Sequence, residues 1–592
     1  DGSMYTGNES DFVSASKNNF LYSYTRNTNK LNNFRGLGGL SVSYTFTDWL
    51  KITEKVNVDA VYGYANLFTD PTTHDGFNVK EPLKSGDIFN QLVRNITLTN
   101  QVSASGNIPL AKDHSLNYIA LMEYDRFANV SFGAEGIGLV SGKLKALDVA
   151  AIPFDVNGNG TDYTFVSYLG QANYNFKGRY TINASYRSDG SSRFGLNKRY
   201  GNFYSIGASW VLIDEDFMKN QKVLSDLRLR GSYGLAGNAD FDNFVATALY
   251  AYNTSYNGAP GNAPNTIGNK NLTWEKTKSS NIGVEAAVLD NRIKLTFDVY
   301  KRITNGLLMN TPVSSTSGFT QQQTNVGSVQ NKGIEALLSS TNLKFGGFEW
   351  QTDFNFSLNR NKILELYGGQ DITGSITIQR VGNHVTSWYM YRWAGVDPLN
   401  GNPLWLTADN KTTTSSLNAA NKVIAGSAEP RYIGSLTNKF SYKGIGLSFM
   451  LYGVTGNKIL NQTRVLADAD GVYFGYNYSR QQGQNYWRKP GDIAERPMPK
   501  LGGNNNANSA TSTRFLENGK FLRLKDITLS YNLPSAWLKH AKMTKAYVFA
   551  TGTNLITWTG YTGWDPEQDM AANEFFRYPP SKTVSLGLNV NF

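Results

Sequence analysis

The chain has 592 residues, with 40% apolar and 13% aromatic side chains and a formal net charge of +11 at pH 7. Many aromatic but few apolar side chains are typical of a barrel with a polar lumen and aromatic girdles. The absence of cysteine excludes disulfides, thiol catalysis and cysteine-based metal sites. No apolar run is long enough for a transmembrane helix. Lys and Arg are scattered instead of clustered, so we expect no nucleic-acid partner.

Apolar and polar residues alternate in many segments, and a period of two indicates β-strands. In the last segment Val584, Leu586 and Leu588 fall on one face, and Ser585 and Gly587 fall on the other. In chain order we predict seventeen strands, near residues 35–46, 49–62, 90–106, 115–129, 161–176, 179–191, 199–213, 225–236, 273–289, 291–304, 329–343, 346–360, 430–442, 444–456, 520–532, 543–556 and 581–592. Long strands without a blade-like repeat favour a membrane barrel over a soluble β-propeller or a string of sandwiches.

The connections between these strands alternate between short and long. Two-residue turns such as Lys177-Gly178 and Lys443-Gly444 contrast with long stretches near 63–89, 130–160, 237–272, 305–328, 361–429, 457–519 and 557–580. Short periplasmic turns and long extracellular loops are typical of outer-membrane barrels. The predicted fold class is therefore all-β, a transmembrane antiparallel β-barrel whose strands pair in chain order, with the long loops at one rim.

The odd number of predicted strands has a consequence for closure. Neighbouring strands of an antiparallel barrel alternate in direction, so an odd number cannot close, and a bare sheet edge is costly in lipid. We expect an odd number of further strands, about five, upstream of these residues. No linker divides the chain, and Asp1-Gly2-Ser3 reads as mid-protein sequence, so we interpret residues 1–592 as the C-terminal portion of one barrel.

Three local patterns refine this prediction. The apolar phase slips at Lys525-Asp526, which indicates a β-bulge. Residues 214–218 and 534–540 are predicted to form short helical turns at the periplasmic rim. Arg228 and Arg230 alternate with Leu227 and Leu229, so the arginines should face a hydrated lumen and the leucines should face lipid.

Seven strings of residues, found in order over nearly the whole chain, match one family. They are 185–195 (SYRSDGSSRFG), 227–238 (LRLRGSYGLAGN), 271–285 (NLTWEKTKSSNIGVE), 325–335 (NVGSVQNKGIE), 391–404 (YRWAGVDPLNGNPL), 521–534 (FLRLKDITLSYNLP) and 578–592 (YPPSKTVSLGLNVNF). Together they resemble the SusC-like (starch-utilisation-type, RagA-like) TonB-dependent transporters of Bacteroidota. The resemblance implies a 22-stranded barrel with a plugged lumen. It also implies TonB-coupled import of oligosaccharides or peptides across the outer membrane, with a SusD-like surface lipoprotein as a lid.

The chain departs from this family in one respect, and the family implies several further partners. The N-terminal regulatory-like domain, the TonB box, the plug and the first strands are not in these residues, so TonB should act through that missing part. The resemblance implies outer-membrane lipid and lipopolysaccharide as surroundings and the BAM machinery during assembly. It also implies a dimer of the transporter–lipoprotein pair. The terminal aromatic residue, Phe592, is the expected assembly signal.

The motifs that could carry other chemistry are few. Asp155, Asn157 and Asn159 open like a calcium loop, but Val166 stands where such a loop needs a bidentate Glu. A Gly/Asn-rich turn before a strand is therefore the favoured interpretation. The four histidines lie far apart, and we find no phosphate-binding loop, dinucleotide fingerprint or nucleophile elbow, so we expect neither an enzyme nor a cofactor.

Two features of the predicted loops could instead contact other molecules. Asp189-Gly190 is predicted as a turn at a strand end, in which Arg187 and Asp189 form charge-assisted bonds. Aromatic side chains in the long loops could stack on sugar rings or peptide side chains, or could belong to interfacial girdles; they are Tyr391, Trp393, Trp405, Tyr473, Tyr476, Tyr478 and Trp487. Loops 361–429 and 457–519 are the expected partner-binding segments, because insertions of this length are usually functional or disordered.

Two other function classes remain open at this stage. One is a passive diffusion porin, which a plug and a TonB box upstream would exclude. The other is a surface binding or adhesion scaffold that transports nothing, for which a permanently blocked lumen would be the sign. Loop composition does not separate glycan from peptide as the substrate, because aromatic and amide side chains bind both.

Overall fold

The computed structural model describes residues 20–592 except 474–478, 480–483, 541 and 570. Within these residues, 17 strands form one antiparallel sheet in chain order. They are β1 (Thr28–Thr47), β2 (Leu50–Thr69), β3 (Asp87–Ala111), β4 (His114–Ile137), β5 (Ile152–Phe176), β6 (Tyr180–Ser191), β7 (Tyr200–Val211), β8 (Leu224–Asn238), β11 (Glu275–Val288), β12 (Ile293–Asn305), β15 (Ser328–Phe345), β16 (Phe348–Glu365), β24 (Tyr432–Tyr442), β25 (Ile445–Thr455), β28 (Phe521–Asn532), β29 (Lys545–Thr559) and β31 (Thr583–Asn591). The predicted strands and their pairing in chain order are confirmed.

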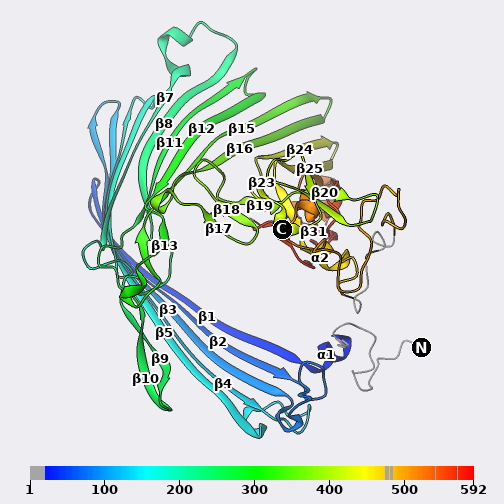
Figure 1. The fold of residues 1–592 in the computed structure, drawn as a ribbon. Helices are drawn as coiled ribbons and strands as arrows, with labels where there is room; N and C mark the ends of the chain where they lie inside the picture. Colours follow the sequence, from blue (N-terminus) through cyan, green and yellow to red (C-terminus); the bar gives the residue numbers. More distant parts are fainter. Residues whose placement is uncertain (1–19, 474–478, 480–483, 541, 570) are drawn as a thin grey trace.

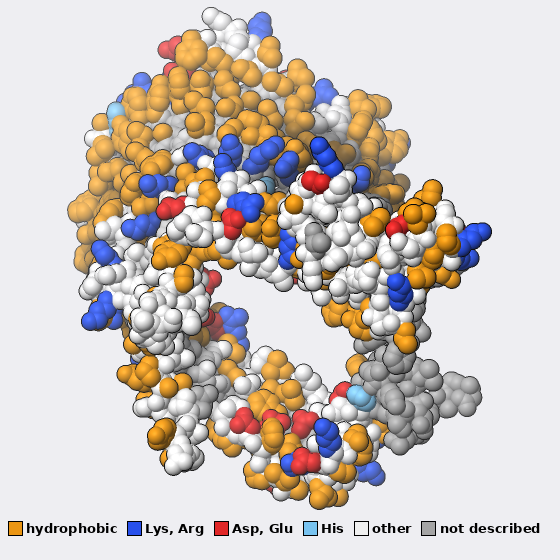
Figure 2. All heavy atoms as spheres, in the orientation of Figure 1, with side chains coloured by type: hydrophobic (Ala, Val, Ile, Leu, Met, Phe, Trp, Pro, Cys, Tyr) orange, Lys and Arg blue, Asp and Glu red, His pale blue; other side chains and the backbone are white. Residues whose placement is uncertain are grey.

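The two faces of this sheet differ in chemistry along every strand. On β12, Leu295 and Phe297 lie on one face and Asp298 lies on the other. Residues opposite each other in a ladder share a face, so the apolar face continues sideways, as where Val299 lies between Ile282 and Ile334. The apolar face suits lipid, and the polar face lines the inside of the curved sheet. Figure 2 shows the apolar surface that results.

Short turns and aromatic side chains mark the periplasmic end of the sheet. Lys177 and Gly178 join β5 to β6, and both have positive φ, the backbone twist that two-residue hairpin turns require. Tyr180 and Trp210 stack at this end, with ring centroids 6.2 Å apart. Further along the sheet Trp350 and Phe440 stack in the same way. This arrangement forms the predicted aromatic girdle at this interface.

The predicted bulge lies on β28. Asp526 pairs with Met450 and Leu524 pairs with Leu451, so Lys525 between them has no ladder partner. The extra residue shifts the phase of the strand, and both Leu522 and Leu529 therefore face outward although their positions differ by an odd number, seven.

Helices in the described chain are short; the first precedes β1, and the others lie in the connections between strands of the main sheet. They are α1 (Phe20–Arg26), α2 (Gln462–Ala467) and α3 (Ser535–His540), with 3-10 turns η2 (Pro82–Lys84), η3 (Leu147–Val149), η4 (Leu212–Asp214), η5 (Asp216–Met218), η6 (Ser315–Ser317), η7 (Tyr367–Gly369), η8 (Leu417–Ala419) and η9 (Thr513–Phe515). The helical turns predicted at 214–218 and 534–540 are thus present. None of the helices described is long and apolar enough to cross a bilayer.

The long connections carry secondary structure of their own, which alternation alone did not predict. They contain the hairpins β9–β10 (Leu249–Tyr256, Ala259–Thr266) and β13–β14 (Leu308–Pro312, Gln321–Asn325), a sheet of β17 (Ile372–Thr373), β18 (Thr377–Gln379), β19 (Ser387–Tyr391) and β23 (Lys422–Ser427), a sheet of β20 (Trp393–Val396), β21 (Pro403–Leu406) and β22 (Thr413–Thr414), and a sheet of β26 (Lys458–Asn461), β27 (Leu516–Asn518) and β30 (Asn573–Glu574).

The main sheet curls around an opening but does not close on itself. Over the described residues β1 pairs only with β2, and β31 pairs only with β29. Figure 1 shows the curved sheet with the strands β1 to β5 on one side and the connections after β16 on the other. Figure 2 shows the opening between them.

Candidate functional site

The three connections that follow β16, β25 and β29 pack into one unit, which we call the loop module (residues 366–431, 456–520 and 560–582). In it, β26 of the second connection pairs with β30 of the third. The Tyr391 amide of the first connection donates to the Thr511 carbonyl of the second, at 2.9 Å. All three connections contribute to one buried core, formed by Trp388, Met390, Ala428, Ile459, Leu460, Phe515, Tyr561 and Ala572. The module is therefore a folded unit beside the opening (Figure 1).

Two of the aromatic side chains predicted to contact a substrate are buried inside this module. Trp405 is fully buried and packs edge-on against Trp393, with ring centroids 5.9 Å apart. Trp487 is also buried, and its Nε1 donates to the Pro398 carbonyl at 2.9 Å. Both indoles therefore stabilise the module, and neither presents a face to a substrate in this conformation.

The other predicted aromatics differ in their surroundings. Tyr391, Trp393 and Tyr473 are half-buried. The Arg514 guanidinium lies 5.1 Å from the Trp393 ring centre, and the Lys422 ammonium lies 5.2 Å from that of Tyr391. Cations therefore already lie against two of these rings. Tyr476 and Tyr478 lie outside the described residues.

Buried ion pairs hold the loop module together at its second connection. Arg514 binds both carboxylate oxygens of Asp470, and both side chains are almost fully buried. Arg464 donates to Asp468 and to Glu517, each at 2.8 Å. Burying charges is costly unless each one is paired, so the loss of one partner would leave an uncompensated charge inside the module.

The two buried aspartates of this network respond differently to their surroundings. Burial alone would raise the pKa of Asp468, but the Ser479 hydroxyl and the Arg464 guanidinium lower it below its ordinary value. Burial raises the pKa of Asp470 even though Arg514 binds it. Protonation of Asp468 therefore destabilises the folded module, whereas protonation of Asp470 stabilises it.

A second buried ion pair anchors the loop module to the main sheet of 17 strands, which we call the wall. Arg523 on β28 is buried and donates to Asp565 and to Glu567, each at 2.6 Å. The unpaired bulge residue Lys525 also binds Glu567, at 2.8 Å. Lys525 thus lies as a second cation beside Arg523, and the third connection is fixed against the inner face of the wall.

Charged side chains also line the inner face of the wall. Arg187 donates to Asp189 at 2.6 Å and to Glu123 at 3.0 Å. The predicted charge-assisted bond is confirmed, but the predicted turn is wrong, because Asp189 and Gly190 lie within β6 and pair with β5 and β7. The alternation along the neighbouring residues outweighed the turn preference of Asp-Gly.

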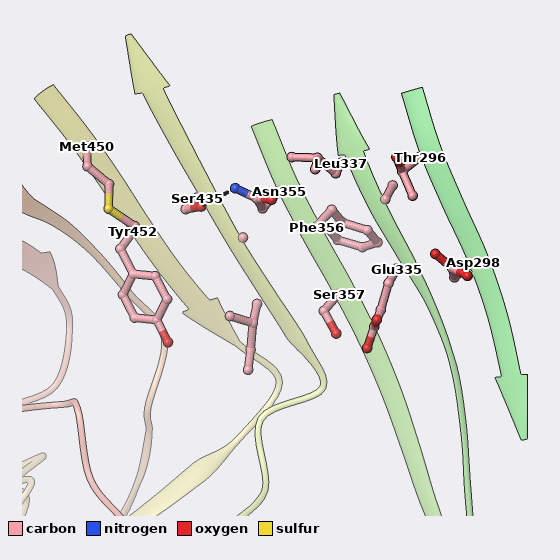
Figure 3. A pocket seen from close by; sticks show the side chains of 13 residues that line it. Thr296, Asp298, Glu335, Leu337, Asn355, Phe356, Ser357, Ser435, Met450 and Tyr452 are labelled. Atoms are coloured by element: carbon pink, nitrogen blue, oxygen red, sulfur yellow. Dashed lines mark hydrogen bonds between the residues drawn. The ribbon is translucent and has the colours of Figure 1, made fainter. Parts of the chain in front are cut away.

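Further round the wall a second charged group borders a groove of about 400 Å³. Arg230 donates to Asp298 at 2.6 Å and lies 3.2 Å from Glu285, which confirms its predicted inward direction. Asp298 and Glu335 lie opposite each other in the ladder and line the groove, with Tyr452 at its far end (Figure 3). Hydroxyl and amide side chains lie along the groove between Glu335 and Tyr452. Such a surface can hydrogen-bond a polar solute.

The weak calcium candidate does not form a loop. Asp155, Asn157 and Asn159 lie within β5, so the predicted turn before the strand is wrong as well. An extended strand spreads these three side chains over about 13 Å, too far for one ion. In the described part of the chain no three His, Cys, Asp or Glu side chains are grouped to hold a metal. Phe592, the predicted assembly signal, has an exposed side chain.

Sequence reasoning missed the charged residues that build the site. Arg514 and Asp470 are 44 residues apart, and Arg523 and Asp565 are 42 apart. No local pattern joins residues at such separations. The one available signal was the phase slip at Lys525, which marked a place where the wall departs from regular alternation.

Comparison with known proteins agrees with this architecture. A family model described as "TonB dependent receptor-like, beta-barrel" matches residues 2–555. TonB-dependent receptor P39 of Formosa agariphila is 30% identical over 74% of the chain and 48% of the relative. TonB-dependent receptor SusC of Bacteroides thetaiotaomicron is 30% identical over 73% of the chain and 44% of the relative. The solved structure of the RagAB peptide transporter superposes with a TM-score of 0.86 at 28% identity, over 96% of this chain and 63% of that one.

The chain spans about half the length of the curated relatives that it matches. The matched family consists of transporters, which are not enzymes. The family model covers most of the chain, and the sheet, the inner polar face and the periplasmic turns are those of an outer-membrane barrel. The chain therefore belongs to the TonB-dependent receptor-like β-barrel family, among its SusC-like members, and is an integral outer-membrane protein.

Proposed function

We propose that this chain forms the barrel portion of a TonB-coupled importer of oligosaccharides or peptides. The observation that carries the proposal is the agreement with the RagAB transporter over 96% of the chain, loop module included. That structure is described as a peptide transporter, whereas SusC is described as a TonB-dependent receptor. A polar inner face that surrounds an opening is consistent with passage of a hydrophilic substrate.

The open sheet edges support a further part of the proposal. The backbone groups on the free sides of β1 and β31 lack ladder partners in the described residues. Unpaired edges cost several kcal/mol per group in lipid, so strands from outside the described residues complete the barrel in this proposal. The plug and the TonB-contacting segment then belong to the same missing part of the complete protein.

A SusD-like lipoprotein binds the loop module in this proposal. Leu399, Ile493 and Leu501 are exposed apolar side chains on its first and second connections. The segments that carry them lie side by side, because Gly491 donates to the Pro398 carbonyl at 2.8 Å and Met498 donates to that of Gly401 at 2.9 Å. Exposed apolar side chains on neighbouring segments are typical of a protein-binding surface.

Exchanging these three side chains tests the partner. In the complete protein, the triple variant Leu399→Ser, Ile493→Ser, Leu501→Ser should lose the lipoprotein on co-purification but keep its barrel in the membrane. Trimming either loop is less informative, because it would remove part of the buried core. The control Val140→Ser changes an exposed apolar side chain of another extracellular connection and should retain the lipoprotein. Equal recovery from both variants would refute this binding surface.

Uptake by cells that produce the complete protein separates the three function classes. Labelled oligosaccharides and labelled peptides are supplied in parallel, with and without an uncoupler of the proton-motive force. An active importer accumulates one class of substrate and stops when the uncoupler is added. Uptake that is insensitive to the uncoupler would instead indicate a porin, and surface binding without any uptake would indicate a scaffold.

A further inference from the structure

Five basic side chains form a compact group on the outer face of the wall, which we call the outer basic cluster (Lys278, Lys301, Lys332, Arg360 and Lys362). Lys301 lies opposite Lys332, and Lys332 lies opposite Arg360, so these three form one row across β12, β15 and β16. In the next row Lys278 lies opposite Ile303, and Lys362 lies opposite Gln330. All five side chains are exposed.

The neighbouring row shows which face the cluster is on. Val299 lies between Ile282 and Ile334 in the ladder, and Ile334 pairs with Leu358. This apolar row is two residues from the basic row along each strand, and therefore on the same, lipid-facing side. The basic row lies nearer the end of β12 at Asn305, which leads into a long connection. The cluster therefore borders the apolar band at its extracellular edge, where Figure 2 shows Lys and Arg side chains along the apolar surface.

The cluster differs from the charged groups on the inner face described above because its cations lack counter-charges. None of its five side chains makes an ion pair with another described residue. On the inner face beside it, Asn359 and Asn361 donate to Asn331, and Asn359 also donates to Glu429 at 2.9 Å. By contrast, the inward Arg230 and the buried Arg523 each bind two carboxylates.

Like charges directly opposite each other in a sheet destabilise it, and this row contains two such pairs. Strands are about 4.8 Å apart and same-face neighbours about 6.6 Å apart, so the cluster, which extends from β11 to β16, spans roughly 14 Å by 7 Å. An anion that carries more than one phosphate would engage several of these cations at once and remove the repulsion. In an outer-membrane protein, the polyanionic groups at this height belong to the lipid headgroups of the outer leaflet.

We propose that the outer basic cluster binds the phosphorylated headgroup of lipopolysaccharide. The proposal rests on the outer-membrane location and on the unpaired charges, and it does not depend on what the protein imports. The bound lipid neutralises the cluster and fixes the height of the wall in the membrane at β11 to β16.

The test uses the complete protein in detergent and measures bound lipid by native mass spectrometry. The probes are diphosphoryl lipid A, the same lipid with its phosphates removed, and inorganic phosphate. The triple variant Lys301→Gln, Lys332→Gln, Arg360→Gln should bind diphosphoryl lipid A about 100-fold more weakly than the wild type, since each surface cation contributes roughly a factor of five. The control Arg302→Gln removes the adjacent cation on the opposite face of β12 and should bind normally.

The other two probes identify the source of the phosphate. Dephosphorylated lipid should bind the wild type as weakly as diphosphoryl lipid A binds the triple variant, and millimolar inorganic phosphate should displace little lipid. Binding within threefold of wild type in the triple variant would overturn the proposal, as would equal binding of the two lipids or full displacement by inorganic phosphate. If the triple variant does not fold, judged by heat-modifiable gel mobility, Lys332→Gln alone should weaken binding about fivefold.

Discussion

The wall and the loop module differ in the exposure of their charged side chains. On the wall, outward side chains are mostly apolar and inward ones are polar, and most of its ion pairs are partly exposed, as with Arg187, Arg228 and Arg230. In the loop module Arg514 and Asp470 are almost fully buried against each other. Inward charged side chains on the wall therefore remain hydrated and can be substituted, whereas charged side chains in the module depend on specific partners.

This difference indicates how each region responds to change. A wall strand pairs with its neighbours along its whole length, so the loss of one inward side chain leaves the ladder intact. The module consists of short strands joined by a small shared core, so each buried pair carries a larger share of its stability. Arg523 belongs to both regions, because it lies on wall strand β28 and binds the third connection of the module.

Removing Arg523 should therefore have the largest effect. Arg523→Ala leaves Asp565 without its ion-pair partner and Glu567 with Lys525 alone, and breaking a buried ion pair costs about 3–5 kcal/mol. Urea unfolding of the complete protein, followed by proteolysis of the module, measures this loss. The control Arg577→Ala removes an exposed pair with Asp569 in the same connection and should cost about 0–1 kcal/mol. Equal midpoints for the two variants would contradict the proposed anchor.

A charge on the lipid face of the last strand should have the next largest effect. Leu586 is 83% exposed on the outward face of β31, so Leu586→Arg should cost about 2–4 kcal/mol if it lies near the midplane. Heat-modifiable gel mobility of outer-membrane fractions reports folding.

The control for Leu586→Arg is Asn589→Arg, which points a cation into the hydrated interior and should fold nearly as wild type does. Gly587 is a poor control, because a side-chain carbon there would lie 2.2 Å from the Phe549 ring. If Leu586→Arg and Asn589→Arg fold equally well, the assigned facing is wrong.

The smallest predicted effect is the dependence of the loop module on pH. The pKa of Asp468 is lower in the folded state, so its ionised form stabilises the module above the unfolded value of about 3.9. That stability is lost as the pH falls below about 4, through the folded pKa. The pKa of Asp470 is raised in the folded state, so ionisation of this carboxyl group destabilises the module. This change occurs at higher pH, between the unfolded pKa and the raised folded pKa, and is therefore complete above the pH range of the Asp468 effect. Hydrogen exchange in the module, corrected for the intrinsic rate, should show protection falling below pH 4.

The variant Asp468→Asn provides the comparison for this pH dependence. Its module should already be less protected at neutral pH and should lose little more on acidification. A wild-type profile that is flat down to pH 3, or a variant profile with the same fall, would show that Asp468 does not control the module.

Local alternation of apolar and polar residues was enough to predict the wall. Alternation over ten or more residues assigns each side chain to lipid or interior without reference to any distant residue, so the seventeen strands, their order, the bulge at Lys525 and the inward direction of Arg230 could all be predicted. The errors arose where a short motif was given more weight than the surrounding strand, at Asp189-Gly190 and at Asp155.

The packing of the loop module could not be predicted from local patterns in the sequence. Its core joins residues such as Trp388 and Tyr561 from separate connections, and the Arg514–Asp470 and Arg523–Asp565 ion pairs each join residues more than 40 positions apart. Trp405 and Trp487 are residue types that are common on binding surfaces, but both side chains lie in the interior of the module. The reason is physical: a strand in a membrane barrel has two environments that a local period can encode, whereas the burial of a loop residue depends on which other loops pack against it.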